Sequence, residues 1–145
     1  METYRQLKER QKKEINAFPL GACFSKKQFE EMMANWGLTE NDTDKILSIG
    51  AGCYIRKSDS QAFHDIINRH AKEHADAIAA DKTGNGYIYQ MFLYELGNHE
   101  YCITYDLTDT LEALGLSIEQ IDKDKRLTHG LEKAIKEYMK HSDDY

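Results

Sequence analysis

The chain has 145 residues, 41% of them hydrophobic, which is enough for one compact domain with its own core. Its net charge of −6 argues against direct binding to nucleic acid, which requires a basic surface. The N-terminal segment is charged and no run approaches about 18 apolar residues, so we expect no membrane span and a soluble, cytoplasmic protein.

Two helices are predicted near the N-terminus. The capping-box spacing of Thr3–Gln6 begins a helix over about residues 4–16, which Pro19 ends. A second capping box at Ser25 begins a helix with large apolar side chains on one face. Gly37 closes this helix in a Schellman end.

Small and apolar residues flank the second helix. We expect these segments, residues 20–24 and 48–56, to pair as a small two-stranded antiparallel element supported by the helix. One or two helical turns are expected within residues 39–47. A third capping box at Ser58 then begins a strongly amphipathic helix that runs to about Ala80.

The segment that follows is predicted to be the central helix, over about residues 87–97. Its side chains are apolar or aromatic almost all the way round, and only Gln90 and Glu95 are plainly polar, so other elements should pack on at least two of its sides. A turn over residues 81–86 precedes it. Gly97 is expected to end it in the left-handed conformation.

Three shorter predictions complete the chain. Residues 101–105 have β-forming composition or serve as a connector, residues 106–114 form a short helix closed by Gly115, and residues 117–122 form another helical turn. An amphipathic helix begins near Leu127, and residues 141–145 are expected to fray.

Together these elements predict a mostly helical α+β fold. We expect a single domain over residues 1–145, with roughly five to seven helices around the central one and the small two-stranded β element. The three cysteines are widely spaced and form no CxxC pair, which argues against a disulfide framework and against a thiolate zinc site.

One motif has metal-ligand spacing. His70, Glu73 and His74 match the H-x-x-E-H pattern, in which two imidazoles on one helix face share a zinc ion and the glutamate acts as general base. A third ligand would come from Glu95, His99 or Glu100. The alternatives are a structural or adventitious metal, or histidines packed in the core, because both lie on the apolar stripe of their helix. The core interpretation is preferred, so we expect no metal, no cofactor and no catalytic residue.

The loop after Ala80 resembles the start of a calcium-binding EF-hand. Residues 81–88 carry ligand types at the first, third and fifth positions and a glycine at the sixth. Phe92 stands at position 12, where the motif requires a bidentate carboxylate. A plain connector between two helices is therefore expected.

The stretches IAADKTGNGYIYQMFLYELGNHEYCITYDLTDTLEALGL and NAFPLGACFSKKQFEEMM resemble a family of short uncharacterised proteins, a domain of unknown function, from Firmicutes and their phages and mobile elements. The resemblance covers nearly the whole chain and implies no activity. Proteins of this size and origin often bind and inhibit a host or defence protein.

We therefore expect a protein-binding module without catalysis, in which an acidic face occupies the basic groove of a nucleic-acid-binding partner. The competing hypothesis is a small zinc-dependent hydrolase. The partner and the oligomeric state stay open. The candidate contact residues are the tyrosines and acidic residues after the central helix: Tyr101, Tyr105, Asp106, Asp109, Glu112, Glu119, Asp122 and Asp124.

Overall fold

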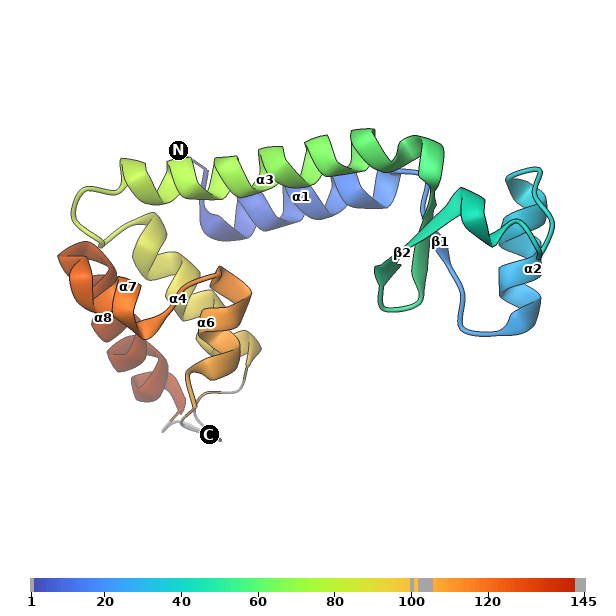
Figure 1. Cartoon of the computed structure of the whole chain (residues 1–145). Coiled ribbons are helices and arrows are strands. Elements are labelled where there is room, and N and C mark those ends of the chain that lie inside the picture. Colours follow the sequence, from blue (N-terminus) through green and yellow to red (C-terminus); the bar gives the residue numbers. More distant parts are fainter. Residues whose placement is uncertain (1, 100, 102–105, 143–145) are drawn as a thin grey trace. The chain divides into compact units, whose positions relative to one another are not determined.

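The computed structural model describes residues 2–99, 101 and 106–142 (Figure 1). This part of the chain is mostly helical with a small antiparallel sheet, which confirms the predicted fold class. The seven α-helices of the described residues are α1 (Tyr4–Ala17), α2 (Lys26–Asn35), α3 (Ser60–Ala80), α4 (Tyr87–Asn98), α6 (Thr108–Leu114), α7 (Ile118–Lys123) and α8 (Lys125–Ser142). No described helix combines the length and the apolar character needed to cross a membrane.

Contacts divide the chain into two compact units. Unit 1 comprises Met1–Glu9 and Glu73–Tyr145, and unit 2 comprises Arg10–Lys72. Unit 1 is discontinuous in sequence, because unit 2 lies between its two segments. The boundaries fall within α1 and α3, so each of these helices contributes residues to both units. The prediction of a single domain stays a prediction.

Unit 2 contains the sheet, which has three strands and not the two that were predicted. β1 (Gly21–Ala22) and β2 (Ile46–Gly50) flank β3 (Cys53–Arg56), and both pair with it in antiparallel fashion. The predicted pairing of segments 20–24 and 48–56 is confirmed by β1 and β3. Residues 48–56, however, form a hairpin because the chain reverses at residues 50–52, which all have positive φ.

A small core joins α2 to this sheet. Met32 and Met33 are buried together with Ile46, and the Phe29 and Tyr54 rings pack edge to face at 5.9 Å between centroids. A Cβ atom on Gly21 would clash with the Met32 side chain, so glycine allows the strand to approach the helix closely without displacing Met32.

The capping residues in the sequence predicted both ends of α2 correctly. The Ser25 hydroxyl accepts a hydrogen bond from the Gln28 amide, and Gly37 has a φ of 70° while the Leu38 amide donates to the Met33 carbonyl, as in a Schellman end. The expected helical turns within 39–47 reduce to one 3-10 turn, Thr43–Lys45. The third helix begins at Ser60, after a second such turn, and not at Ser58.

Unit 1 is built around α4, as predicted. The inner residues of this helix are at most 4% exposed: Tyr87, Ile88, Met91, Phe92, Glu95 and Leu96. Figure 1 shows α4 gathered with α6, α7 and α8, and α8 is its principal neighbour. Gly130 of α8 permits this approach, because a Cβ there would lie 2.6 Å from Cγ2 of Ile88.

The end of α4 differs from the prediction. The helix continues through Gly97 to Asn98, and Gly97 does not have the left-handed conformation expected of a stop. It faces α8, where a Cβ would lie 3.7 Å from the Tyr138 ring. Gly115, in contrast, ends α6 with a φ of 69°, and Ser117 begins α7 with a complete capping box.

Candidate functional site

A buried carboxylate lies at the centre of unit 1. Glu95 of α4 is fully buried, and its Oε1 accepts hydrogen bonds from the Tyr4 hydroxyl at 2.5 Å and from Nζ of Lys8 at 3.1 Å. Its Oε2 accepts a long hydrogen bond from the Asn98 amide at 3.5 Å and lies 3.2 Å from Nε2 of His99. The charge of Glu95 is therefore compensated by Lys8 of α1, and the neutral Asn98 amide adds a donor from the end of α4.

Aromatic rings enclose this carboxylate. The Tyr4 ring packs against those of His74, Tyr87 and Tyr94, with centroids 5.5–5.8 Å apart. His74 Nδ1 and the Tyr87 hydroxyl lie 2.6 Å apart and share a hydrogen bond whose donor depends on the histidine tautomer. We call the residues Tyr4, Lys8, His74, Tyr87, Tyr94, Glu95, Asn98 and His99 the Glu95 cluster.

The pKa directions of the ionisable groups in this cluster favour one set of protonation states, in which the tyrosines donate and Glu95 accepts. Burial alone would raise the pKa of Glu95, but the hydrogen bonds from Tyr4 and Lys8 outweigh burial and lower it, so the carboxylate is ionised at neutral pH. Burial raises the pKa of Tyr4 and of Tyr87, which keeps both hydroxyls protonated. Burial, assisted by the charge of Lys8, lowers the pKa of His74 and favours its neutral form.

Sequence reasoning missed most of this cluster. Glu95 entered the prediction only as a possible zinc ligand, and Tyr4 and Lys8 were assigned no role. A usable signal was present, because a glutamate within a helix that is apolar on nearly all sides is buried and needs a cation. The identity of that cation depends on contacts between residues far apart in sequence.

The structure gives the two motif histidines separate partners. In unit 2, His70 Nε2 lies 2.5 Å from Oε1 of Glu14, whose other oxygen accepts from Arg69. In unit 1, His74 contacts Tyr87, as described above. Glu73 is half-buried on α3. His74 is thus paired with a tyrosine and His70 with a carboxylate.

The other proposed zinc ligands have different neighbours. Glu95 and His99 lie together in the Glu95 cluster, and Glu100 falls outside the described residues. Within residues 2–99, 101 and 106–142, no group of three or more histidine, cysteine, aspartate or glutamate side chains is placed to hold a metal ion.

In the loop that resembles an EF-hand, the Asp81 side chain binds backbone amides of the same loop and of α4. The two carboxylate oxygens of Asp81 accept hydrogen bonds from four amides, those of Thr83, Gly84, Gly86 and Ile88, at 3.0–3.3 Å. Although burial would raise the pKa of Asp81, these bonds lower it. Phe92, at the position of the missing carboxylate ligand, is fully buried in the core. The loop therefore serves as a connector that also caps the start of α4.

Four of the proposed contact residues are exposed on two short helices. Asp109 and Glu112 lie on α6, and Glu119 and Asp122 lie on α7; all four are exposed. The opposite sides of these helices are buried through Leu111, Leu114 and Ile121. We call the four exposed carboxylates the acidic face.

The other contact candidates have different environments. Asp106 is exposed and accepts from the Thr108 amide and hydroxyl, whereas Asp124 pairs with Arg126. Tyr101 is half-buried, with its ring centroid 6.5 Å from that of Tyr138. Tyr105 lies outside the described residues. The structure thus adds neither of the two tyrosines to the acidic face.

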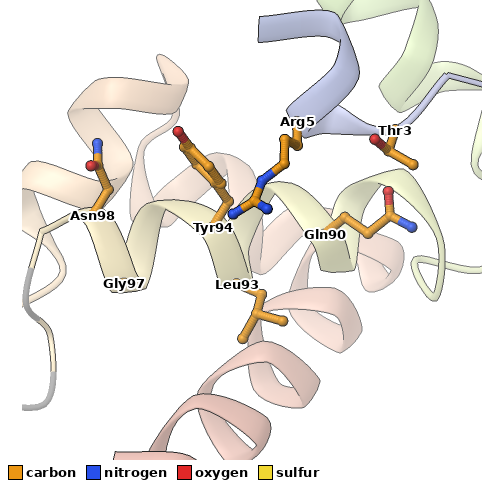
Figure 2. A pocket seen from close by; sticks show the side chains of 7 residues that line it. All are labelled: Thr3, Arg5, Gln90, Leu93, Tyr94, Gly97 and Asn98. Atoms are coloured by element: carbon orange, nitrogen blue, oxygen red, sulfur yellow. The ribbon is translucent and has the colours of Figure 1, made fainter. Parts of the chain in front are cut away.

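A pocket of about 540 Å³ lies beside the Glu95 cluster in unit 1, between the start of α1 and α4. Figure 2 shows the Arg5 side chain reaching from α1 over α4, between Tyr94 and Gln90. Its guanidinium carbon lies 5.6 Å from the centre of the Tyr94 ring. The lining residues are Thr3, Arg5, Gln90, Leu93, Tyr94, Gly97 and Asn98. Sequence reasoning did not find this pocket, because its two walls are distant in the chain.

Comparison with known proteins identifies a family whose function is unknown. Residues 3–137 match the model of a family of unknown function, DUF7659, so a single family model spans residues of both units. No curated protein and no solved structure matches the sequence.

Proposed function

Since the chain belongs to the family of unknown function DUF7659, we propose from its own surface chemistry that it is a protein-binding module without catalysis. The acidic face carries this proposal. It presents four exposed carboxylates on two short helices that are consecutive in the sequence, in a chain whose net charge is −6. Such a face repels nucleic acid and attracts a basic protein surface.

The partner that fits this chemistry has a groove rich in lysine and arginine. A groove of that kind otherwise holds the phosphates of nucleic acid, so the acidic face would compete with them. The resemblance to proteins of Firmicutes, phages and mobile elements suggests the context. We propose that the chain is an accessory protein that inhibits a host or defence protein.

The test neutralises the acidic face without altering side-chain shape. The variant Asp109→Asn, Glu112→Gln, Glu119→Gln, Asp122→Asn removes four negative charges. A matched control removes four exposed negative charges from unit 2: Glu30→Gln, Glu31→Gln, Glu40→Gln and Asp44→Asn. Both variants change the net charge equally, so a difference between them reports the location of the contact.

Each protein is used as bait in a Firmicute lysate at low and at moderate salt, and captured proteins are quantified by mass spectrometry. We expect a basic nucleic-acid-binding protein that the parent and the control variant capture and the acidic-face variant loses. Added duplex DNA should displace the chain from this partner, and capture should weaken with salt. Equal capture by both variants would contradict the proposed surface.

A further inference from the structure

We propose that the pocket between α1 and α4 binds a small organic carboxylate with a flat apolar body. The pocket lies in unit 1 and uses none of the residues of the acidic face. Its volume of about 540 Å³ falls within the range of roughly 300–1,000 Å³ that is typical of small-molecule sites. The inference is therefore independent of the proposed protein contact.

Arg5 supplies the charge for this ligand. Its guanidinium is held against the Tyr94 ring, and among the described residues it has no carboxylate partner and no hydrogen bond. Lys8, one turn further along α1, also lies over Tyr94, with Nζ 5.7 Å from the ring centre. Lys8 is already paired with Glu95, so among the described residues that line or border the pocket Arg5 is the one whose positive charge is left for a ligand.

The lining of the pocket sets the shape of the ligand. Leu93 and the Tyr94 ring offer apolar surface, and Gly97, which has no side chain, leaves room along the same side of α4. Thr3, Gln90 and Asn98 place hydroxyl and amide groups at the edges. A ligand with a flat hydrocarbon body and one polar end matches this combination.

The charge balance selects a carboxylate over a phosphate. Glu95 and Lys8 compensate each other, so the pocket retains about one positive charge, which one carboxylate neutralises. A phosphate dianion would place an uncompensated negative charge near the ionised Glu95. The planar guanidinium also offers paired N–H groups that match the two oxygens of a carboxylate.

The test titrates the full chain with 2-naphthoate by NMR and calorimetry. The comparison ligands are 2-naphthamide, which is neutral, and 2-naphthyl phosphate, which is a dianion. We expect saturable binding of 2-naphthoate, at least tenfold weaker binding of the amide, and weaker binding of the phosphate. Absence of saturable binding at millimolar 2-naphthoate, or tighter binding of the phosphate, would overturn the proposal.

Variants locate the site. Arg5→Gln should weaken 2-naphthoate binding at least tenfold, whereas Lys12→Gln, which removes an exposed positive charge elsewhere on α1, should leave it unchanged. Gly97→Leu should narrow the pocket while the circular dichroism spectrum stays that of the parent, because Gly97 lies within a helix, lines the pocket, and a Cβ there would have only the Tyr138 ring, at 3.7 Å, as a neighbour. Equal affinities of the Arg5 and Lys12 variants would refute the assignment, as would undiminished binding by a folded Gly97→Leu chain.

Discussion

The hydroxyl of Tyr4 and the carboxylate of Glu95 meet at 2.5 Å although the two residues are 91 positions apart. Both side chains are buried, and the bond joins the first turn of α1 to the last turn of α4. Lys8 adds a second donor to the same oxygen. One carboxylate oxygen thus fixes the N-terminal turn of α1 to the core of unit 1.

Replacing Tyr4 by phenylalanine should lower the free energy of unfolding by about 1–3 kcal/mol, because a buried carboxylate loses a donor. The matched control is Tyr94→Phe in the same cluster. The Tyr94 hydroxyl has no hydrogen bond within the described residues, so this change should stay within about 0.5 kcal/mol. Urea unfolding followed by circular dichroism measures both, and equal losses would show that the Tyr4–Glu95 bond contributes nothing specific.

Glu95 should make the free energy of unfolding depend on pH in the acidic range. Its pKa is lowered in the folded chain, so its contribution is complete above the unfolded pKa of about 4.3 and is lost as the pH falls through the lower folded value. Glu95→Gln should cost roughly 1.5–3 kcal/mol at pH 7. The difference from the parent should shrink below about pH 4. Unfolding curves between pH 7 and pH 3 test this, and a constant difference would contradict it.

Two leucines on α4 should respond differently to truncation. Leu96 is fully buried, so Leu96→Ala should cost about 2–5 kcal/mol through lost contacts and a residual cavity. Leu93 is only partly buried and borders the pocket, so Leu93→Ala should cost clearly less. Thermal unfolding of both variants ranks the two positions. The reverse order would mean that the depth of α4 in the core is misjudged.

Calcium at millimolar concentration should leave the melting temperature unchanged. The oxygens of Asp81 are already engaged by four amides, and Phe92 offers no ligand at position 12 of the loop. Asp81→Asn serves as the control, because it weakens these hydrogen bonds and should lower the melting temperature. A saturable rise with calcium, reversed by a chelator, would reveal a functional site.

The two glycines at the interface of α4 and α8 should have opposite effects. A Cβ at Gly130 would lie 2.9 Å from the Gly84 carbonyl oxygen and still closer to Ile88, so Gly130→Ala should cost about 1–3 kcal/mol. Gly97 is helical and has room for a Cβ, so Gly97→Ala should add roughly 0.5–1 kcal/mol. Differential scanning calorimetry distinguishes the two signs.

Features encoded by neighbouring residues could be predicted from the sequence. The apolar character of residues 87–97 identified α4, and Ser25, Gly37 and Gly115 marked helix ends, because the hydrogen bonds of a cap connect residues only a few positions apart. The acidic face also followed from local spacing, since the apolar sides of α6 and α7 bury and leave the carboxylates outside.

Features that depend on distant contacts could not be predicted. Gly97 carries the composition of a helix stop, but it lies within α4 beside Tyr138 of α8. The partners of Glu95 come from α1, and the pocket wall formed by Arg5 comes from the same distant segment. Residues 48–56 were also read as one strand, because two glycines suit a bulge as well as the hairpin that they form.

The discontinuity of unit 1 has a consequence for how the chain folds during synthesis. Tyr4 and Lys8 emerge from the ribosome before unit 2, but their partner Glu95 on α4 is made only after all of unit 2. The aromatic side chain of Tyr4 is therefore exposed to solvent until α4 has been made. The contact between Tyr4 and Glu95 closes a loop of about 90 residues, which slows the burial of Tyr4. Unit 2 can complete its sheet earlier, so the last event of folding should be the docking of the N-terminal turn onto Glu95.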